Sequence, residues 1–305
     1  MLSRADVAQI AREEGLDAFA DELSACARPG WWLLPGGEDR PGASKVGGDP
    51  DFGEGESWPL NRRGIPMAFV AQIDAARLPS FDRPWELATP WRHDGRLFRF
   101  FADLLDNPVE PGPAVALVTD PASPLTRTPA PPVPEPFPPG GEWDDYEPRD
   151  ALYCLPETVV RLHPFLTAPE THPTLHPEFH NYGRDPDARR YEQWAGRLRV
   201  DGATDRQPYP WEVQHLLGEP SSIQDDVRST GVMFNGPDGF WAAVAGYPPD
   251  PALTSQDAWA VVLGLHMDQD FGLDIHDDGA IHILAPVTEL AAGRLDRLVC
   301  SIDSG

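Results

Sequence analysis

Residues 67–74 read Met-Ala-Phe-Val-Ala-Gln-Ile-Asp, and residues 94–101 read Asp-Gly-Arg-Leu-Phe-Arg-Phe-Phe. The first run is apolar and short, which predicts a buried strand that ends at Asp74. The second run follows an Asp-Gly pair, and glycine accepts the positive φ that a tight turn requires. The two runs therefore predict neighbouring strands in a fold built mainly on sheets.

A similar pattern recurs near the C-terminus. Residues 262–268 read Val-Leu-Gly-Leu-His-Met-Asp, and an Asp-Gly pair at 278–279 precedes the apolar run 280–284. This alignment places Asp74 opposite Asp268. A duplicated β-unit would explain the echo, and chance similarity over so short a stretch is the alternative.

The remaining segments complete the expected α+β architecture. Helical spacing predicts two short helices within residues 3–27, where Ser3 and Asp6 form a capping box, and a further helix at 187–199. Strands are predicted at 31–34, 114–119, 151–166 (divided by Pro156), 232–234, 240–244, 259–267 and 280–284, with a short helix at 289–294. We therefore expect a sheet-rich, mostly antiparallel fold with short N-terminal helices and, if the echo is a duplication, two related β-lobes.

Composition divides the chain into four regions. Much of the proline, 36 residues in all, falls between residues 108 and 139, and proline cannot donate to a sheet from a central strand. The expected regions are a helical segment at 1–30, a first β-rich half at 31–119, a Pro-rich acidic connector at 120–150 and a second half at 151–305.

The charge balance restricts the classes of partner. Lys plus Arg number 24 and Asp plus Glu number 49, so the formal net charge is −25 and the pI is about 4.5. Such a chain repels polyanions, which argues against nucleic acid or an anionic membrane as the main partner and favours a basic protein. The N-terminus lacks a signal-like apolar region, no run suits a membrane span, and the cysteines at 26, 154 and 300 form no framework, so we expect a cytoplasmic protein.

An ordered set of short motifs resembles the YwqG-like family, a bacterial group of domains of unknown function. The matching segments are Ser44–Pro50, Trp58-Pro59, Gly64–Asp74, Leu78-Pro79, Gly95–Phe101, His215–Gly218, Ile223–Asp225, Asp268–Gly279 and Leu298–Ile302. The resemblance implies an α+β fold dominated by sheets and brings no catalytic residue. The chain departs from it at Gly264, His266 and His282, where the family tends to have Gln, Asp and an aromatic residue.

Gln72 and Asp74 are the first candidates for a ligand site. Alternation along a strand places both side chains on one face, opposite Phe69, Ala71 and Ile73. They are expected either to bond the backbone of a neighbouring loop or to line a pocket with Trp58 and Gln224.

Two groups of residues in the sequence have the side chains of metal ligands. Asp268, Asp270 and Asp274 form a loose oxygen-ligand candidate, although the EF-hand pattern is absent and a solvated loop is the alternative. His172, His176 and His180 share a helical spacing, but the prolines at 173 and 177 push the residues before them out of the helical region.

The sequence predicts no cofactor and leaves open whether the protein is an enzyme. It contains no phosphate-binding glycine loop and no nucleophile elbow. The favoured function is a protein-binding or regulatory module with an acidic surface. The alternative is an enzyme, or a binder of a small molecule or divalent ion, with a cleft near Gln72, Asp74 and Trp58.

Overall fold

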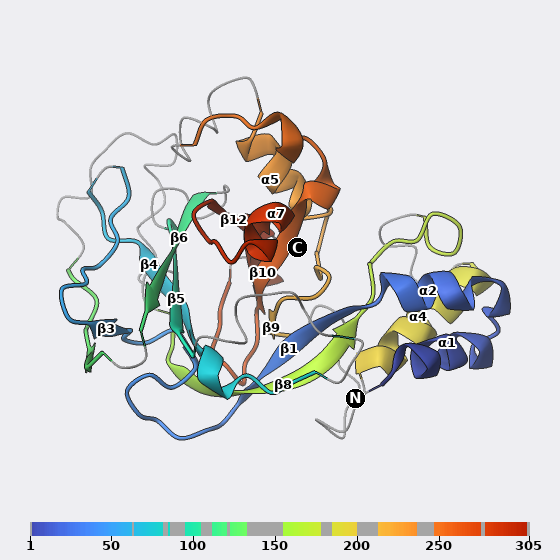
Figure 1. Ribbon diagram of the computed structural model, residues 1–305, viewed down its shortest axis with the longest axis horizontal. Helices are drawn as coiled ribbons and strands as arrows, with labels where there is room; N and C mark the ends of the chain where they lie inside the picture. Colours follow the sequence, from blue (N-terminus) through green and yellow to red (C-terminus); the bar gives the residue numbers. More distant parts are fainter. Residues whose placement is uncertain are drawn as a thin grey trace.

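A computed structural model describes residues 2–62, 64–81, 85, 95–104, 112–120, 123–132, 155–177, 185–199, 213–236, 247–275 and 278–303. Its centre is a closed antiparallel barrel (Figure 1) with the strand order β1-β8-β2-β4-β5-β6-β12-β11-β10-β9. The barrel strands are β1 (Arg28–Pro35), β2 (Lys45–Val46), β4 (Ala68–Asp74), β5 (Leu97–Ala102), β6 (Gly112–Thr119), β8 (Thr158–Thr167), β9 (His215–Leu216), β10 (Trp259–His266), β11 (Ala280–Pro286) and β12 (Leu298–Asp303). The predicted sheet-rich, antiparallel α+β fold is confirmed.

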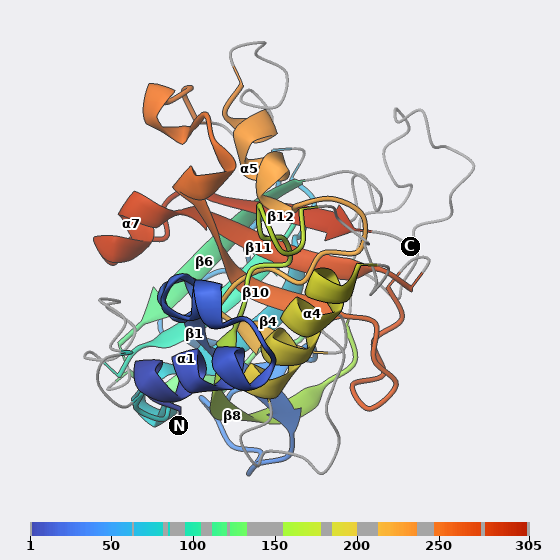
Figure 2. The same cartoon turned by 90° about the vertical axis from the view of Figure 1, so that its right-hand side faces the viewer.

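A second, small sheet and several short helices surround the barrel. The sheet pairs β3 (Asp51–Gly53) with β7 (Leu125–Arg127). The helices α1 (Arg4–Glu13), α2 (Ala20–Cys26) and α4 (Pro186–Arg199) gather on one side (Figure 2), and α5 (Arg228–Phe234) and α7 (Val287–Ala291) lie elsewhere on the barrel. The capping box at α1 is present as predicted, because Ser3 and Asp6 bond each other's backbone N–H. Among the described residues, no helix combines the length and apolar character needed to cross a membrane.

The strand order of the barrel divides into two matching series of five strands, which we call the first and the second copy. Each strand of the first copy corresponds to one of the second: β1 to β8, β2 to β9, β4 to β10, β5 to β11 and β6 to β12. The hydrogen bonding crosses between the copies. β2 of the first copy pairs with β8 of the second, and β9 of the second copy pairs with β1 of the first. The two halves therefore complete a single barrel and do not stand apart as separate lobes.

Backbone details fix the alignment of the two copies. The ladder of β4 and β5 is interrupted at Val70, and that of β10 and β11 at Val262. The amide of Gly47 donates to Val70 O at 2.9 Å, and the amide of Leu217 donates to Val262 O at the same distance. This correspondence pairs Asp74 with His266, whereas the echo in the sequence paired it with Asp268.

The short connections after β2 and β9 also match. Gly47 and Gly48 have φ values of 61° and 70°, and Leu217 and Gly218 have φ values of 57° and 101°. Leucine rarely adopts this left-handed conformation, because its Cβ crowds the backbone. That it does so here indicates that the bond to Val262 O and the burial of its side chain hold the turn in place.

Several expected elements differ in detail. The strand expected at 232–234 was wrong, because those residues belong to helix α5, whose Gly231 packs against Trp259. Of the two stretches expected within 151–166, the one after Pro156 is strand β8, and most of the one before it lies outside the described residues. Strand β7 lies inside the expected connector, and both the strand expected at 240–244 and most of that connector fall outside the described residues.

Candidate functional site

A row of buried polar side chains crosses the first copy of the unit. Lys45, Gln72 and Arg99 are register neighbours on β2, β4 and β5, and all three are fully buried. Phe98 and Phe100, which flank Arg99, belong to the main hydrophobic core. Alternation therefore directs the polar row to the opposite, outer face of the barrel wall.

Gln72 is fully engaged with the loop that leads into β3. Its Oε1 accepts from Asp51 N at 2.9 Å, while its Nε2 donates to Ala43 O and to Asp51 Oδ2, both at 2.8 Å. These bonds satisfy the donors and use the acceptor of a buried amide. The side chain thus joins the barrel to β3, as expected for an amide that bonds a neighbouring loop.

The charged members of the row form ion pairs with surface carboxylates. Lys45 Nζ lies 2.8 Å from Glu157 Oε2, and Arg99 makes a two-point contact with Glu56 at 2.5 and 2.8 Å. Burial opposes the ionisation of Glu56, but hydrogen bonds from Arg99, Thr119 and a backbone amide outweigh it and lower the pKa to about 2. The row is therefore a charged network that fastens loops to the barrel.

Asp74 and Trp58 are also occupied by the fold. Asp74 Oδ1 accepts from Ala76 N at 3.1 Å, which caps the short helix η2 (Ala75–Arg77), and Oδ2 lies 2.7 Å from Arg40. Trp58 Nε1 donates to Met67 O at 2.8 Å, and its ring packs on Phe101 with centroids 5.5 Å apart. Neither side chain is directed into a pocket with Gln72 by these contacts.

The other sequence candidates lie in the second copy. Gln224 is exposed between β9 and α5, on a segment tied to β12 through Ile223 N and Asp303. Asp268 accepts from Asp270 N at 2.8 Å and from Gln214, while Asp270 and Asp274 are exposed. Throughout the described ranges, no three His, Cys, Asp or Glu residues are grouped closely enough to hold a metal ion.

The histidines at 172 and 176 form a tight turn, as their flanking prolines predict. Their backbones exchange hydrogen bonds of 2.8 and 2.9 Å, so no helix aligns the rings. Each ring instead faces a carboxylate of a different helix, with His172 Nε2 3.4 Å from Glu22 and His176 Nε2 3.4 Å from Glu192. The turn thereby links α2 and α4, and His180 lies outside the described residues.

The second copy carries histidines where the first carries its charged row. By the alignment of the copies, His215, Gly264 and His282 correspond to Lys45, Gln72 and Arg99. His215 and His282 are buried, and the ring of His266 lies edge-on to that of His282 with centroids 5.3 Å apart. Three imidazoles thus meet on the outer face of β9, β10 and β11.

His282 has the most constrained environment of these histidines. Its Nε2 lies 3.2 Å from Ser221 O, whereas its buried Nδ1 has no hydrogen-bond partner. Burial, together with the nearby His215, lowers the pKa of His282 to about 3, although Ser221 O and Asp226 oppose the shift. His282 is therefore neutral at ordinary pH.

Sequence reasoning did not select this cluster as a site. The sequence feature that pointed to it was the departure from the family pattern at Gly264, His266 and His282. The sequence did not reveal strand β9, which brings His215 beside these residues, because a two-residue strand has no periodicity.

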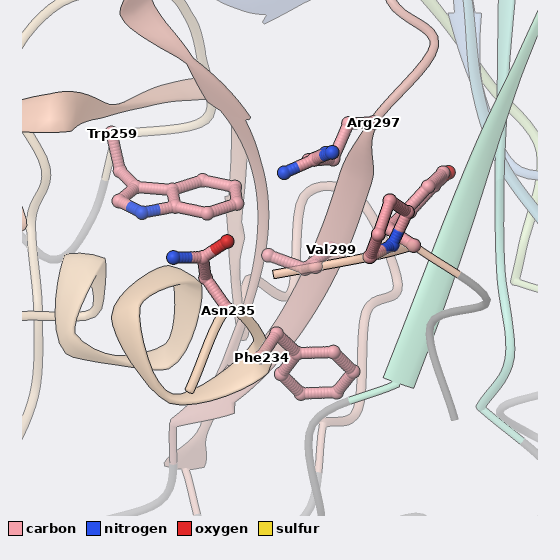
Figure 3. A pocket seen from close by; sticks show the side chains of 7 residues that line it. Phe234, Asn235, Trp259, Arg297 and Val299 are labelled. Carbon is pink, nitrogen blue, oxygen red and sulfur yellow. The ribbon is translucent and has the colours of Figure 1, made fainter. Parts of the chain in front are cut away.

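A small pocket lies between the end of α5 and strands β10 and β12 (Figure 3). Its cavity volume is about 10 Å³, and it is lined by Phe234, Asn235, Tyr247, Pro248, Trp259, Arg297 and Val299. Asn235 exchanges two hydrogen bonds of 2.7 Å with the backbone of Asp250, and Arg297 lies 5.3 Å from the ring centroid of Tyr247. The amide is thus used to hold the chain near Asp250, and the pocket offers mainly apolar walls.

Residues 44–304 match the sequence profile of a family described as Domain of unknown function (DUF1963). The chain belongs to this family. The matched region contains both polar rows and every barrel strand except β1, so β1 completes a barrel that begins before the family match. No curated protein matches the chain significantly.

Proposed function

We propose that this member of the DUF1963 family is a protein-binding or regulatory module that holds a basic protein partner against an acidic end of the barrel. The acidic end comprises residues 268–275, Asp278 and the adjoining residues 155–158. Thr158 Oγ1 donates to Phe271 O at 3.3 Å, and Gly272 lies against Pro156. This packing is the observation that carries the proposal, because it holds the acidic loop after β10 against the start of β8.

The distribution of charge supports such a surface. Many of the basic side chains are paired within the protein, as in Lys45 with Glu157, Arg99 with Glu56 and Arg197 with Glu13. Asp270, Asp274 and Asp278 are exposed, and none has an ion pair within 4.0 Å among the described residues.

The arrangement favours binding over catalysis near Gln72, Asp74 and Trp58. Each of those side chains bonds a named group of the protein itself, and that leaves little polar chemistry for a substrate. Assignment to the YwqG-like proteins, a bacterial source and a cytoplasmic location belong to the same proposal, and they rest on the motifs and on the spacing of the cysteines.

The experiment compares two variants with equal charge changes. One replaces Asp270, Asp274 and Asp278 by Asn, and the control replaces the exposed Asp17, Asp225 and Asp257 by Asn. Asn accepts the positive φ of 53° at position 278, so the first variant keeps its loop conformation.

Each tagged protein is used as bait in a native lysate at low ionic strength and then washed with increasing salt. We expect the unaltered protein and the control to retain a cationic protein that salt releases, and the 270/274/278 variant to lose it. Equal retention by both variants, or no salt-sensitive cationic partner, would contradict the proposal.

A further inference from the structure

Within the part of the chain that the structure describes, one segment packs on the outer face of β10, β11 and β12. We name residues 220–234 the cover. Its Ile223 N donates to the carboxylate of Asp303, and its Thr230 hydroxyl lies 3.0 Å from that of Ser301. These two links join the cover to β12.

The cover shields apolar side chains on the barrel wall. Its Val227 and Phe234 pack in one cluster with Trp259, Leu284 and Val299, which come from β10, β11 and β12. If the cover left the barrel, this cluster would be exposed to solvent.

His282 lies beneath the cover and bonds it directly. The carbonyl of Ser221 can only accept, so the His282 nitrogen 3.2 Å away, Nε2, carries the proton. Nδ1 then holds the lone pair, and it has no hydrogen-bond partner. The closed cover consequently accommodates the neutral imidazole, and a proton on Nδ1 would find no acceptor.

The groups around His282 favour its neutral form. His266 on β10 and His215 on β9 are both imidazoles, and a charge on either would repel one on His282. Asp226 on the cover is the nearby carboxylate that favours the charged form, but burial and His215 outweigh it. On β12, the register neighbour is Ser301, which carries no charge.

We propose that residues 220–234 form an acid-released cover: in acid, the open form takes up a proton on His282, the cover leaves the barrel, and the apolar outer wall of β10, β11 and β12 is exposed. The device is independent of the proposed acidic binding surface. It works by linkage, because a state that binds the proton more tightly gains population as the pH falls.

The size of the effect follows from the two protonation equilibria. In the open form His282 has its ordinary pKa of 6.5, and in the closed form its pKa is about 3. Lowering the pH from 7 to 5 then raises the population of the open form roughly 25-fold. Between about pH 6 and 4 the population changes by roughly tenfold for each pH unit, since one proton is taken up.

Backbone hydrogen exchange of the full chain tests the proposal, after correction for the intrinsic pH dependence of exchange. We expect exchange in residues 220–234 to rise roughly 25-fold between pH 7 and 5. Residues 50–53, where Asp51 N bonds Gln72 in the first copy, serve as the internal control and should remain protected. An unchanged cover, or an equal rise in both segments, would overturn the proposal.

His282→Gln supplies a second, independent test. Glutamine can still donate to Ser221 O and does not titrate near neutral pH, so the pH response of the cover should disappear. Persistence of the full response in this variant would overturn the proposal. If the variant does not fold, the test rests on the pH dependence of hydrogen exchange in residues 220–234 of the unaltered protein. A rate of exchange that does not change between pH 6 and 4 would refute the mechanism.

Discussion

His215 lies directly over Gly264, so that a Cβ atom built at residue 264 would be 2.5 Å from His215 Nε2. The corresponding pair in the first copy is Lys45 and Gln72, where a long side chain stands at the second position. The second copy can therefore hold His215 in this orientation only because residue 264 has no side chain.

Gly264→Ala is expected to destabilise the protein by about 1–3 kcal/mol, because the new methyl group overpacks the buried ring. Chemical denaturation measures the change. The double variant with His215→Ala should lose less stability than the two single variants together, since the smaller side chain removes the clash. Strict additivity would show that the two residues do not interact.

Gln72→Leu is expected to cost at least about 2 kcal/mol of unfolding free energy. The change leaves the buried Asp51 N and Ala43 O without their bonds to residue 72, and unsatisfied buried groups each cost about 1–3 kcal/mol. Thermal and urea unfolding measure the loss. Gln224→Leu is the control, because its exposed side chain should change stability by less than about 0.5 kcal/mol.

Glu56 is expected to make part of the stability dependent on acid. Its folded pKa of about 2 lies below the ordinary value of 4.5, so the folded protein binds fewer protons than the unfolded chain between these values. The stabilisation that ionised Glu56 contributes is complete above about pH 4.5 and is lost as the pH falls toward 2. Denaturation at several pH values should show that the free energy of unfolding falls less steeply in acid for Glu56→Gln than for the unaltered protein. An equal fall in both proteins would contradict the lowered pKa of Glu56.

Gly231→Ala in α5 is expected to destabilise the protein, although alanine forms helices better than glycine by about 1 kcal/mol. A Cβ at residue 231 would lie 2.2 Å from the indole of Trp259, which is buried. Ser229→Ala on the same helix is exposed and should be nearly neutral. Thermal unfolding and tryptophan fluorescence distinguish the two, and a stabilised Gly231→Ala would refute the packing argument.

Strands with a continuous apolar run could be predicted from the sequence. The runs at 67–74 and 280–284 became β4 and β11, because burial of both faces requires such composition. The run at 232–234 was too short to distinguish a strand from a helix, and its contact with Trp259 decided the outcome. Strands β2 and β9 have two residues each, so only their pairing across the barrel defines them.

For Gln72, the sequence predicted the direction of the side chain but not its hydrogen-bond partner. Alternation along β4 correctly sets Gln72 on the face opposite Ala71 and Ile73, which enter the core. It was wrong for Phe69, because the irregularity at Val70 turns that side chain into a separate cluster with Phe101. Gln72 hydrogen-bonds Asp51, which lies far from it in the sequence and within a glycine-rich segment. Local patterns carry no information about such a partner.

The exchange of strands between the two copies has a consequence for synthesis of the chain. β2 needs β8, and β1 needs both β8 and β9, so the first copy cannot complete its hydrogen bonding until the second has left the ribosome. Contacts between residues as distant as Trp32 and His215 raise the contact order, which slows folding. A nascent chain that stops before residue 158 will expose an unpaired sheet edge, and that edge is a natural target for chaperones.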